Sequence, residues 1–245
     1  MRTFRTFTYK NAHYRFACTL PDIVRKEIIR QREILQKYLI SHPAFHHALS
    51  PVDPLPEAPE IARRMAWGSR KAGTGPMAAV AGTIAQMSAE AALQAGTDEV
   101  IIDNGGDLYL ASKETVHIAL FTGNPSLMGK IALKVEPEYM PTAVCSSSSK
   151  MGHSLSFGKC DLATVIAEDA SLADAAATMV CNKVKRKSDI EPVLNSIVNI
   201  EGIRGIIISK NDKIGISGNI PEIVKVTDPS LLQKITKDTN STFFF

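Results

Sequence analysis

The sequence is short of several features that would point to a familiar class of protein. It has 245 residues, no glycine before Gly68, 6% aromatic residues, and 28 Lys and Arg against 25 Asp and Glu, so its formal net charge is +3. So small an excess excludes binding to nucleic acid or to a membrane surface that is driven by overall charge. With 44% hydrophobic and 22% charged residues, the composition is typical of a folded globular chain rather than a disordered one.

Cysteine motifs and long apolar runs are missing as well. The four cysteines include no C-x-x-C pair and have no His at the spacing of a zinc site, which excludes a zinc finger or a thioredoxin-like motif. The longest uncharged run, residues 72–89, contains Gly, Pro, Thr, Gln and Ser and is too polar for a membrane span. The first residues lack the apolar segment of a signal peptide. We therefore expect a cytoplasmic protein with reduced thiols and with neither a membrane nor a nucleic acid as partner.

The hydrophobic pattern predicts hairpins separated by helices. Residues 3–9 and 13–19 favour a hairpin, and a helix follows from Pro21 until just before Pro43. Five prolines between residues 41 and 59 predict an irregular connection. Residues 77–92 predict a helix that is small or apolar nearly all round and therefore buried on several sides. A later helix is predicted with Ser171 as its N-cap, and residues 205–217 predict a last hairpin. This order favours an α+β fold.

We interpret the chain as one domain, residues 1–245, made of four segments. They are an N-terminal hairpin and helix (1–42), a proline-rich connection (43–59), a core that carries the motifs (60–185), and a C-terminal helix with strands (186–245).

The first candidate binding segment is the glycine turn at residues 73–77. A glycine-rich loop that leads into a helix offers free backbone N–H groups and the positive end of the helix dipole, which suit a phosphate. Neither a dinucleotide fingerprint nor a Walker loop is present, because no G-x-G-x-x-G or G-K-[ST] string follows. Alternatively, the glycines only allow close packing of a buried helix. The candidate ligand-binding residues of this turn are Gly73, Thr74, Gly75 and Met77.

The second candidate is the Asn-Gly-Gly-Asp string at residues 104–107. Two glycines permit positive φ angles and close approach of a ligand, and a carboxylate can accept a hydrogen bond from it. The alternative is an ordinary type I′ hairpin turn. The candidate ligand-binding residues of this turn are Asn104, Gly105, Gly106 and Asp107.

The third candidate is a pair of oxygen ligands on a predicted helix. Asp174 and Thr178 are four residues apart and lie on one helical face, so they could together bind a hard cation such as Mg²⁺. The alternative is that Asp174 stabilises the start of the helix while the Thr178 hydroxyl bonds back to its own helix.

A polar loop lies between two predicted strands, 142–145 and 162–167. It carries Ser146, Ser147, Ser148, His153 and Ser154, which suits either a binding loop or a plain connection. Cys145 and His153 could instead form a nucleophile and base pair. The basic run at residues 183–187 is typical of a solvated helix end rather than of a nucleic-acid site.

Taken in order, four strings of the sequence resemble the UPF0280 family, a branch of the ApbE superfamily whose named members are flavin transferases. The strings are AGTGPMAAVAG at 72–82, DNGGD at 103–107, GHSLSFGK at 152–159 and LADAAAT at 172–178. The resemblance implies an ApbE-like, T-fold-related α+β fold with layers of antiparallel sheet and buried helices.

The resemblance also implies roles for particular residues. In ApbE enzymes a Gly-Gly-Asp turn lines the FAD site, and an A-D-A-x-A-T helix supplies an Asp and a Thr near Mg²⁺. By that likeness Asp107 belongs to a ligand site, Asp174 and Thr178 are candidate metal ligands, and the backbone of residues 73–77 lies near the phosphates or the metal. Beyond the likeness, we expect the serines of the polar loop and His153 to line the same pocket, with Asp174 and His153 as catalytic residues. The implied cofactors are FAD or FMN and Mg²⁺, and the implied chemistry is transfer of FMN from FAD to a Thr hydroxyl, with the metal neutralising the pyrophosphate.

Two strings differ from the ApbE pattern and favour an alternative. Pro76 and Met77 stand where ApbE proteins carry Lys and Gly, and residues 152–157 stand where they carry H-H-x-x-D-P. The alternative is a non-catalytic accessory protein that acts with protein partners in anaerobic sulfur assimilation into homocysteine, or in cofactor metabolism. In either case the buried helix at 77–92 is compatible with a homo-oligomer.

Overall fold

The computed structural model describes residues 2–122, 127, 130–149 and 158–226. Over these residues the helices are α1 (Pro21–Ser41), α2 (Pro43–His47), α3 (Glu60–Ala72), α4 (Val80–Gln94), α5 (Ala170–Lys183) and α6 (Ile190–Ile197), with 3-10 turns η1 (Pro76–Ala79), η2 (Pro137–Tyr139) and η3 (Lys187–Asp189). The strands are β1 (Arg5–Tyr9), β2 (Ala12–Cys18), β3 (Val100–Asn104), β4 (Asp107–Ala111), β5 (Val116–Ala119), β6 (Ile131–Val135), β7 (Thr142–Ser147), β8 (Leu162–Ala167), β9 (Ile203–Lys210), β10 (Lys213–Gly218) and β11 (Glu222–Lys225).

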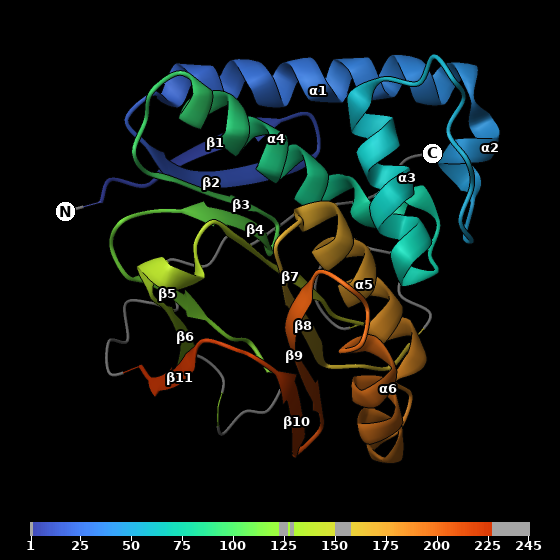
Figure 1. Ribbon diagram of the computed structural model, residues 1–245, viewed down its shortest axis with the longest axis vertical. Helices are drawn as coiled ribbons and strands as arrows, with labels where there is room; N and C mark the ends of the chain where they lie inside the picture. The colour runs from blue at the N-terminus through green and yellow to red at the C-terminus, as the bar shows by residue number, and fades with distance from the viewer. Residues whose placement is uncertain (1, 123–126, 128–129, 150–157, 227–245) are drawn as a thin grey trace.

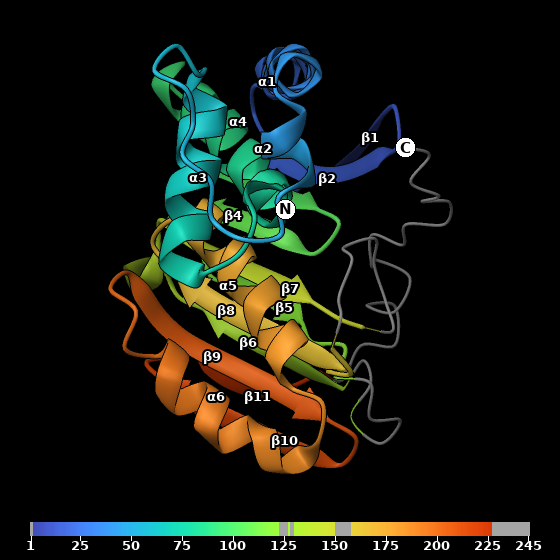
Figure 2. The same ribbon diagram turned by 90° about the vertical axis from the view of Figure 1, so that its right-hand side faces the viewer.

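The described strands form two antiparallel sheets. The larger has eight strands in the order β1-β2-β3-β4-β7-β8-β9-β10, and the smaller has three in the order β11-β6-β5. Figure 1 shows the smaller sheet on one side of the larger sheet and α5 and α6 on the other, while Figure 2 shows the same arrangement turned by 90°. The fold therefore has three layers, helices, large sheet and small sheet, which confirms the α+β class.

Side chains alternate between the two faces of the large sheet and so form two cores, one against the helices and one against the small sheet. Successive side chains of a strand point to opposite faces, so Ile102 of β3 and Val165 of β8 pack toward the helices. Their neighbours Ile101 and Ile166 pack toward the small sheet. Because both faces of the central strands are covered, these strands read as continuous apolar runs in the sequence.

Helices α4 and α5 lie side by side on the large sheet, α4 over β3 and β4 and α5 over β7 and β8. Glycine allows α4, and also α3, to approach the start of α5 closely. A Cβ on Gly82 would lie 2.3 Å from the Ala170 carbonyl oxygen, and one on Gly68 of α3 would lie 2.5 Å from the Ser171 carbonyl carbon. The prediction of a helix buried on several sides is confirmed, because α4 has buried residues all round it.

Several sequence expectations are corrected by the structure. The proline-rich connection contains a short helix, α2, because Pro43 occupies a first-turn position where a missing N–H costs nothing. Ser146 and Ser147 belong to strand β7 rather than to a loop. The N-cap of α5 is Asp169, whose side chain accepts a hydrogen bond from the Leu172 amide, so the prediction of Ser171 in this place was wrong by two residues.

Candidate functional site

The turn between β3 and β4 is the tight hairpin that the sequence predicts. Gly105 and Gly106 have φ angles of 70° and 105°, and Asn104 pairs with Asp107 across them, as in a type I′ turn. The Asp103 carboxylate accepts a hydrogen bond of 2.9 Å from the Gly106 amide. The turn thereby places Asp107 at the first position of β4, opposite Cys145 of β7.

Asp107 is a buried carboxyl group with incomplete hydrogen bonding. The residue is 8% exposed. It lies beside Cys145 and Ser146, whose thiol and amide favour its ionised form, although the Ser146 amide donates its hydrogen bond to the Gly106 carbonyl at 3.1 Å. The Asp107 Oδ1 atom has no hydrogen-bond partner within the described part of the chain. Burial, and next to it the nearby charge of Asp174, raise the pKa of Asp107 well above its usual value. An unpartnered buried oxygen of this kind is costly unless something else binds it.

Asp174 reaches the same place from α5. Its Oδ2 accepts a hydrogen bond of 2.9 Å from the Gly82 amide, and the neighbouring Ala81 amide also favours the ionised carboxylate. These amides belong to the first turn of α4, where free N–H groups and the helix dipole favour an anion. Burial nevertheless dominates and raises the pKa of Asp174 to about 7.

The side chain of Asn104 completes the arrangement. Its Nδ2 donates a hydrogen bond of 3.0 Å to the Ala81 carbonyl and so ties the hairpin turn to the start of α4. We call Asn104, Asp107, Cys145, Asp174 and the Ala81–Gly82 amides the carboxylate cluster. Five elements meet here: α4, β3 and β4, which follow one another in the chain, and β7 and α5, which come later.

No positively charged group compensates the two carboxylates within the described residues. Among the groups that shift the pKa of Asp107 or Asp174, none is a Lys or an Arg. The described part of the chain also has no group of three or more His, Cys, Asp and Glu that could hold a metal ion by itself. Thr178 lies one turn after Asp174 on α5 and is buried. A cation here would thus depend on carboxylate and hydroxyl oxygens, which suit Mg²⁺, together with oxygens from a ligand.

The two glycines of the turn at residues 73–77 each have a structural role in this fold. Gly73 ends α3 in the left-handed region with φ 76°. A Cβ on Gly75 would lie 1.8 Å from the Ala48 carbonyl oxygen, so the proline-rich connection packs directly on this residue. Both observations favour the packing interpretation. The Thr74 hydroxyl is buried and has no hydrogen-bond partner among the described residues, which keeps it available to a ligand.

The serines of the predicted binding loop are engaged within the fold. The Ser146 hydroxyl bonds to Thr164 at 2.9 Å, and Ser148 donates to the Asp161 carbonyl at 2.7 Å, while Ser147 is buried. His153 and Ser154 lie outside the described residues. Cys145 is fully buried, and burial raises the pKa of its thiol well above the usual value, which is the reverse of what an activated nucleophile needs.

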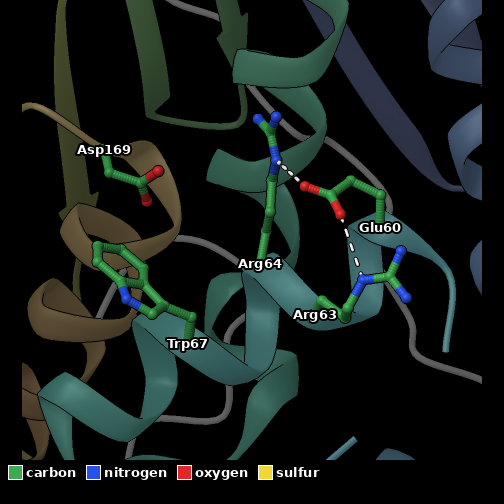
Figure 3. Close-up of a pocket in the computed structure, with 5 residues that line it drawn as sticks. All are labelled: Glu60, Arg63, Arg64, Trp67 and Asp169. Carbon is green, nitrogen blue, oxygen red and sulfur yellow. Dashed lines mark hydrogen bonds and ion pairs between the residues drawn. The ribbon is translucent and has the colours of Figure 1, made fainter. Parts of the chain in front are cut away.

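A separate surface hollow of about 270 Å³ lies between α3 and the start of α5. Figure 3 shows Arg64 at its centre, paired with Glu60, and Trp67 beside Asp169. Arg64 also donates to Glu90 at 2.7 Å, and Asp169 caps α5. The charged groups at its centre are therefore already partnered within the protein.

Sequence reasoning overlooked two parts of the carboxylate cluster. It included Gly82 in the string at residues 72–82 but assigned it no contact with a candidate site residue, and it linked Cys145 to His153 rather than to Asp107. The register that brings Cys145 opposite Asp107 depends on pairing between strands that are far apart in the chain. The sequence held one signal for this role of the Gly82 amide, namely a glycine near the start of an Ala-rich helix.

Comparison with known proteins places the chain in a family. A sequence model of the family described as "AbpE bacteria" matches residues 15–195. A UPF0280 protein of Methanocaldococcus jannaschii is 38% identical over 203 residues, 81% of this chain and 82% of the relative. A UPF0280 protein of Methanocella arvoryzae is 35% identical over 246 residues, 97% of this chain and 99% of the relative.

Solved structures share the fold. The apo form of the flavinyl transferase ApbE of Pseudomonas stutzeri superposes with a TM-score of 0.59 at 11% identity, covering 89% of this chain and 94% of that protein. The ApbE protein of Thermotoga maritima gives 0.58 at 13% identity, covering 89% and 97%. The fold is thus that of the ApbE proteins. Within this class, the chain belongs to the UPF0280 family.

Among the helices that the structure describes, none combines the length and the apolar composition that crossing a bilayer requires.

Proposed function

We propose that this chain binds a flavin nucleotide, FAD or FMN, together with Mg²⁺ at the carboxylate cluster, and that with FAD it transfers the FMN part to an acceptor hydroxyl and releases AMP. The observation that carries the proposal is the buried Asp107 Oδ1, which lacks a partner, beside Asp174 at the start of α4. Two carboxyl groups without a compensating cation are an expensive arrangement in a ligand-free protein. A binding site is the usual reason for retaining such an arrangement.

Each group of the cluster has a role in this proposal. Asp174 and Thr178 would hold Mg²⁺ from one face of α5, and the Ala81 and Gly82 amides would keep the Asp174 carboxylate aimed at it. Asp107 would accept from the ligand, with Asn104 fixing its turn. Bound Mg²⁺ would supply neutralisation of the pyrophosphate charge. The residues fit that cation, because they present hard oxygen donors and no positively charged side chain.

The likeness to known structures supports the flavin as ligand. The Pseudomonas stutzeri protein with this fold is a flavinyl transferase. Because the sequence identity to it is only 11%, the likeness supports the class of ligand, whereas the chemistry at the cluster must be tested on this chain.

Binding without transfer is a second candidate function. Pro76 is buried at the place where the resemblance expects a Lys, and the adjacent Gly75 is covered by the backbone of Ala48. The glycine turn therefore presents no cation to a phosphate. These observations favour a protein that keeps the ligand site and acts with a protein partner, as in the accessory role in sulfur or cofactor metabolism.

Two measurements test the proposal. Calorimetric titration of the protein with FAD is expected to show binding that strengthens at least tenfold when Mg²⁺ is added, and Asp174→Asn is expected to lose the effect of Mg²⁺. Asp98→Asn is the matched control, because Asp98 is exposed and distant in sequence. Absence of FAD and FMN binding in both conditions would refute the proposal. Release of AMP from FAD, followed by chromatography, separates transfer from binding alone.

A further inference from the structure

The surface hollow at the start of α5 lies outside the carboxylate cluster and has a chemistry of its own. Its volume is about 270 Å³, and it is lined by Asp169 together with four residues of α3, namely Glu60, Arg63, Arg64 and Trp67. Pockets for drug-sized ligands measure roughly 300–1,000 Å³. The hollow is therefore sized for a single side chain rather than for a whole nucleotide.

Trp67 presents an aromatic surface to solvent in this hollow. It is the single tryptophan of the chain, and it is 44% exposed. The Lys71 ammonium group lies 4.8 Å from the centre of the Trp67 ring, although Lys71 does not belong to the residues that line the hollow. An indole face attracts cations, and the chain itself already uses this ring in that way. Exposed tryptophans in a hollow are also preferred anchor points for protein partners.

The positive groups of the hollow are paired with carboxylates of the chain. The Arg63 guanidinium group lies 3.3 Å from the Glu60 carboxylate. Arg64 donates to Glu60 at 3.0 Å and to Glu90 at 2.7 Å. Because both arginines have carboxylate partners, the hollow has no surplus positive charge with which to bind an anion.

Asp169 is the charged residue of the hollow that makes no ion pair within the described part of the chain. Its Oδ1 accepts a hydrogen bond of 3.0 Å from the Leu172 amide, and a neutral amide leaves the carboxylate its full charge. When Glu90 is counted with the lining residues, three carboxyl groups stand against two guanidinium groups. The surplus charge is thus negative, and it lies in the same hollow as an exposed indole ring.

We propose that this hollow binds the guanidinium group of an arginine that belongs to a partner protein, through the Trp67 ring and the Asp169 carboxylate. A guanidinium group is planar, so it can stack on an aromatic face while its N–H groups donate to a carboxylate. Figure 3 shows Trp67 and Asp169 together on one side of Arg64, with Glu60 and Arg63 on the other side. The two groups that suit a guanidinium are thus on the same side of the hollow.

The position of the hollow relates a bound partner to the carboxylate cluster. Asp169 precedes Asp174 by five residues, so the two residues lie at levels about 8 Å apart along the axis of α5. Gln86 of α4 ties the two regions together, because its Oε1 accepts from the Ala170 amide at 2.7 Å and its Nε2 donates to Glu90 at 2.9 Å. A partner bound in the hollow would therefore contact the start of the helix that carries Asp174.

The test follows the fluorescence of Trp67 in the full-length protein. Because the chain has one tryptophan, its emission reports on this hollow alone. Titration with the blocked peptide acetyl-Gly-Arg-Gly-amide is expected to change the emission saturably, and high salt should weaken the binding. The same peptide with citrulline, a neutral isostere of arginine, should cause no saturable change at equal concentration.

Two variants identify the groups that bind the peptide. Asp169→Asn removes the charge and keeps the helix cap, since asparagine caps a helix as well as aspartate does, and it should bind the arginine peptide about tenfold more weakly. Asp98→Asn removes an exposed carboxylate elsewhere and is the matched control, which should bind like the wild type. Trp67→Leu, followed by saturation-transfer NMR of the peptide, should also lose the binding.

Several results would overturn the proposal. These are an emission that the arginine peptide leaves unchanged, an equal response to the citrulline peptide, or unweakened binding by Asp169→Asn. Tighter binding of acetyl-Gly-Glu-Gly-amide would assign the hollow to an anion instead. Tighter binding of free arginine than of the blocked peptide would assign it to a free amino acid and not to a protein partner.

The measurements remain decisive if a variant or the proposed function fails. Should Asp169→Asn not fold, the comparison of the arginine and citrulline peptides on the wild-type protein still decides. The peptide titrations contain neither flavin nor Mg²⁺, so failure of flavin binding at the carboxylate cluster leaves them unaffected.

Discussion

The Asp174 carboxylate accepts a hydrogen bond of 2.9 Å from the amide of Gly82, which joins α5 to the first turn of α4. A Cβ at Gly82 would also lie 2.9 Å from the Asp174 Cβ. One glycine therefore has two effects: it lets the helices touch, and it presents its amide to the carboxylate. The consequence is that helix packing and the geometry of the proposed ligand site are coupled at a single residue.

Gly82→Ala tests this coupling. The added methyl group would lie 2.3 Å from the Ala170 carbonyl oxygen, so the helices must separate, and we expect a loss of about 1–3 kcal/mol of stability in urea unfolding. Binding of FAD with Mg²⁺ should weaken at the same time. Gly96→Ala is the control, because nothing lies within 4 Å of its added Cβ and its cost comes from the φ angle of 98° alone. Equal ligand affinity in both variants would contradict the coupling.

Asp107→Asn is expected to change ligand binding and stability in opposite directions. The substitution removes a buried charge beside Asp174, and at alkaline pH, where Asp107 is ionised, we expect the ligand-free protein to be stabilised by about 1 kcal/mol or more. Mg²⁺-dependent ligand binding should be lost. Asp98→Asn, at an exposed ion pair, should change stability by less than about 0.5 kcal/mol. A less stable Asp107→Asn protein would instead assign the carboxylate a purely structural role.

The stability of the metal-free protein should depend on pH through Asp174. Its pKa is raised from 3.8 to about 7 in the folded state, so the folded protein keeps a proton that the unfolded chain releases. The resulting stabilisation is complete below pH 3.8 and is lost as the pH rises through about 7. Urea unfolding in EDTA at a series of pH values should show this decline, and Asp174→Asn should flatten it.

Mg²⁺ should reverse that dependence on pH. A cation binds the ionised carboxylates, so its stabilising effect should grow as the pH rises through the same range. A stability profile that is unchanged by Mg²⁺ would argue against a metal at this cluster.

Gly75→Ala tests the packing interpretation of the glycine turn. Its Cβ would lie 1.8 Å from the Ala48 carbonyl oxygen, and we expect a loss of about 1–3 kcal/mol together with faster proteolysis of residues 48–59. Gly73→Ala is the comparison, since nothing lies within 4 Å of its Cβ and only its φ angle of 76° is strained. If Gly73→Ala keeps full ligand affinity, the turn acts in packing rather than in phosphate binding.

Local patterns in the sequence were enough to predict most elements of this fold. The Gly105-Gly106 hairpin, the helix beginning at Pro21 and the buried helix α4 follow from turn chemistry and periodicity, which act over a few residues. The strand assignment of Ser146 and Ser147 did not follow, because their pairing with Thr164 and Ala163 of β8 overrides the low strand preference of serine.

The sequence by itself determined where the glycines stand, with none before Gly68 and an adjacent pair, Gly105 and Gly106, that permits positive φ angles. It also placed Asp174 and Thr178 on one helical face, since that spacing is a property of any α-helix. Only the tertiary structure decided that Asp107 and Asp174 meet and that Cys145 faces Asp107. Such contacts join residues that are distant in the chain, and they arise from strand register and helix packing, which no local pattern encodes.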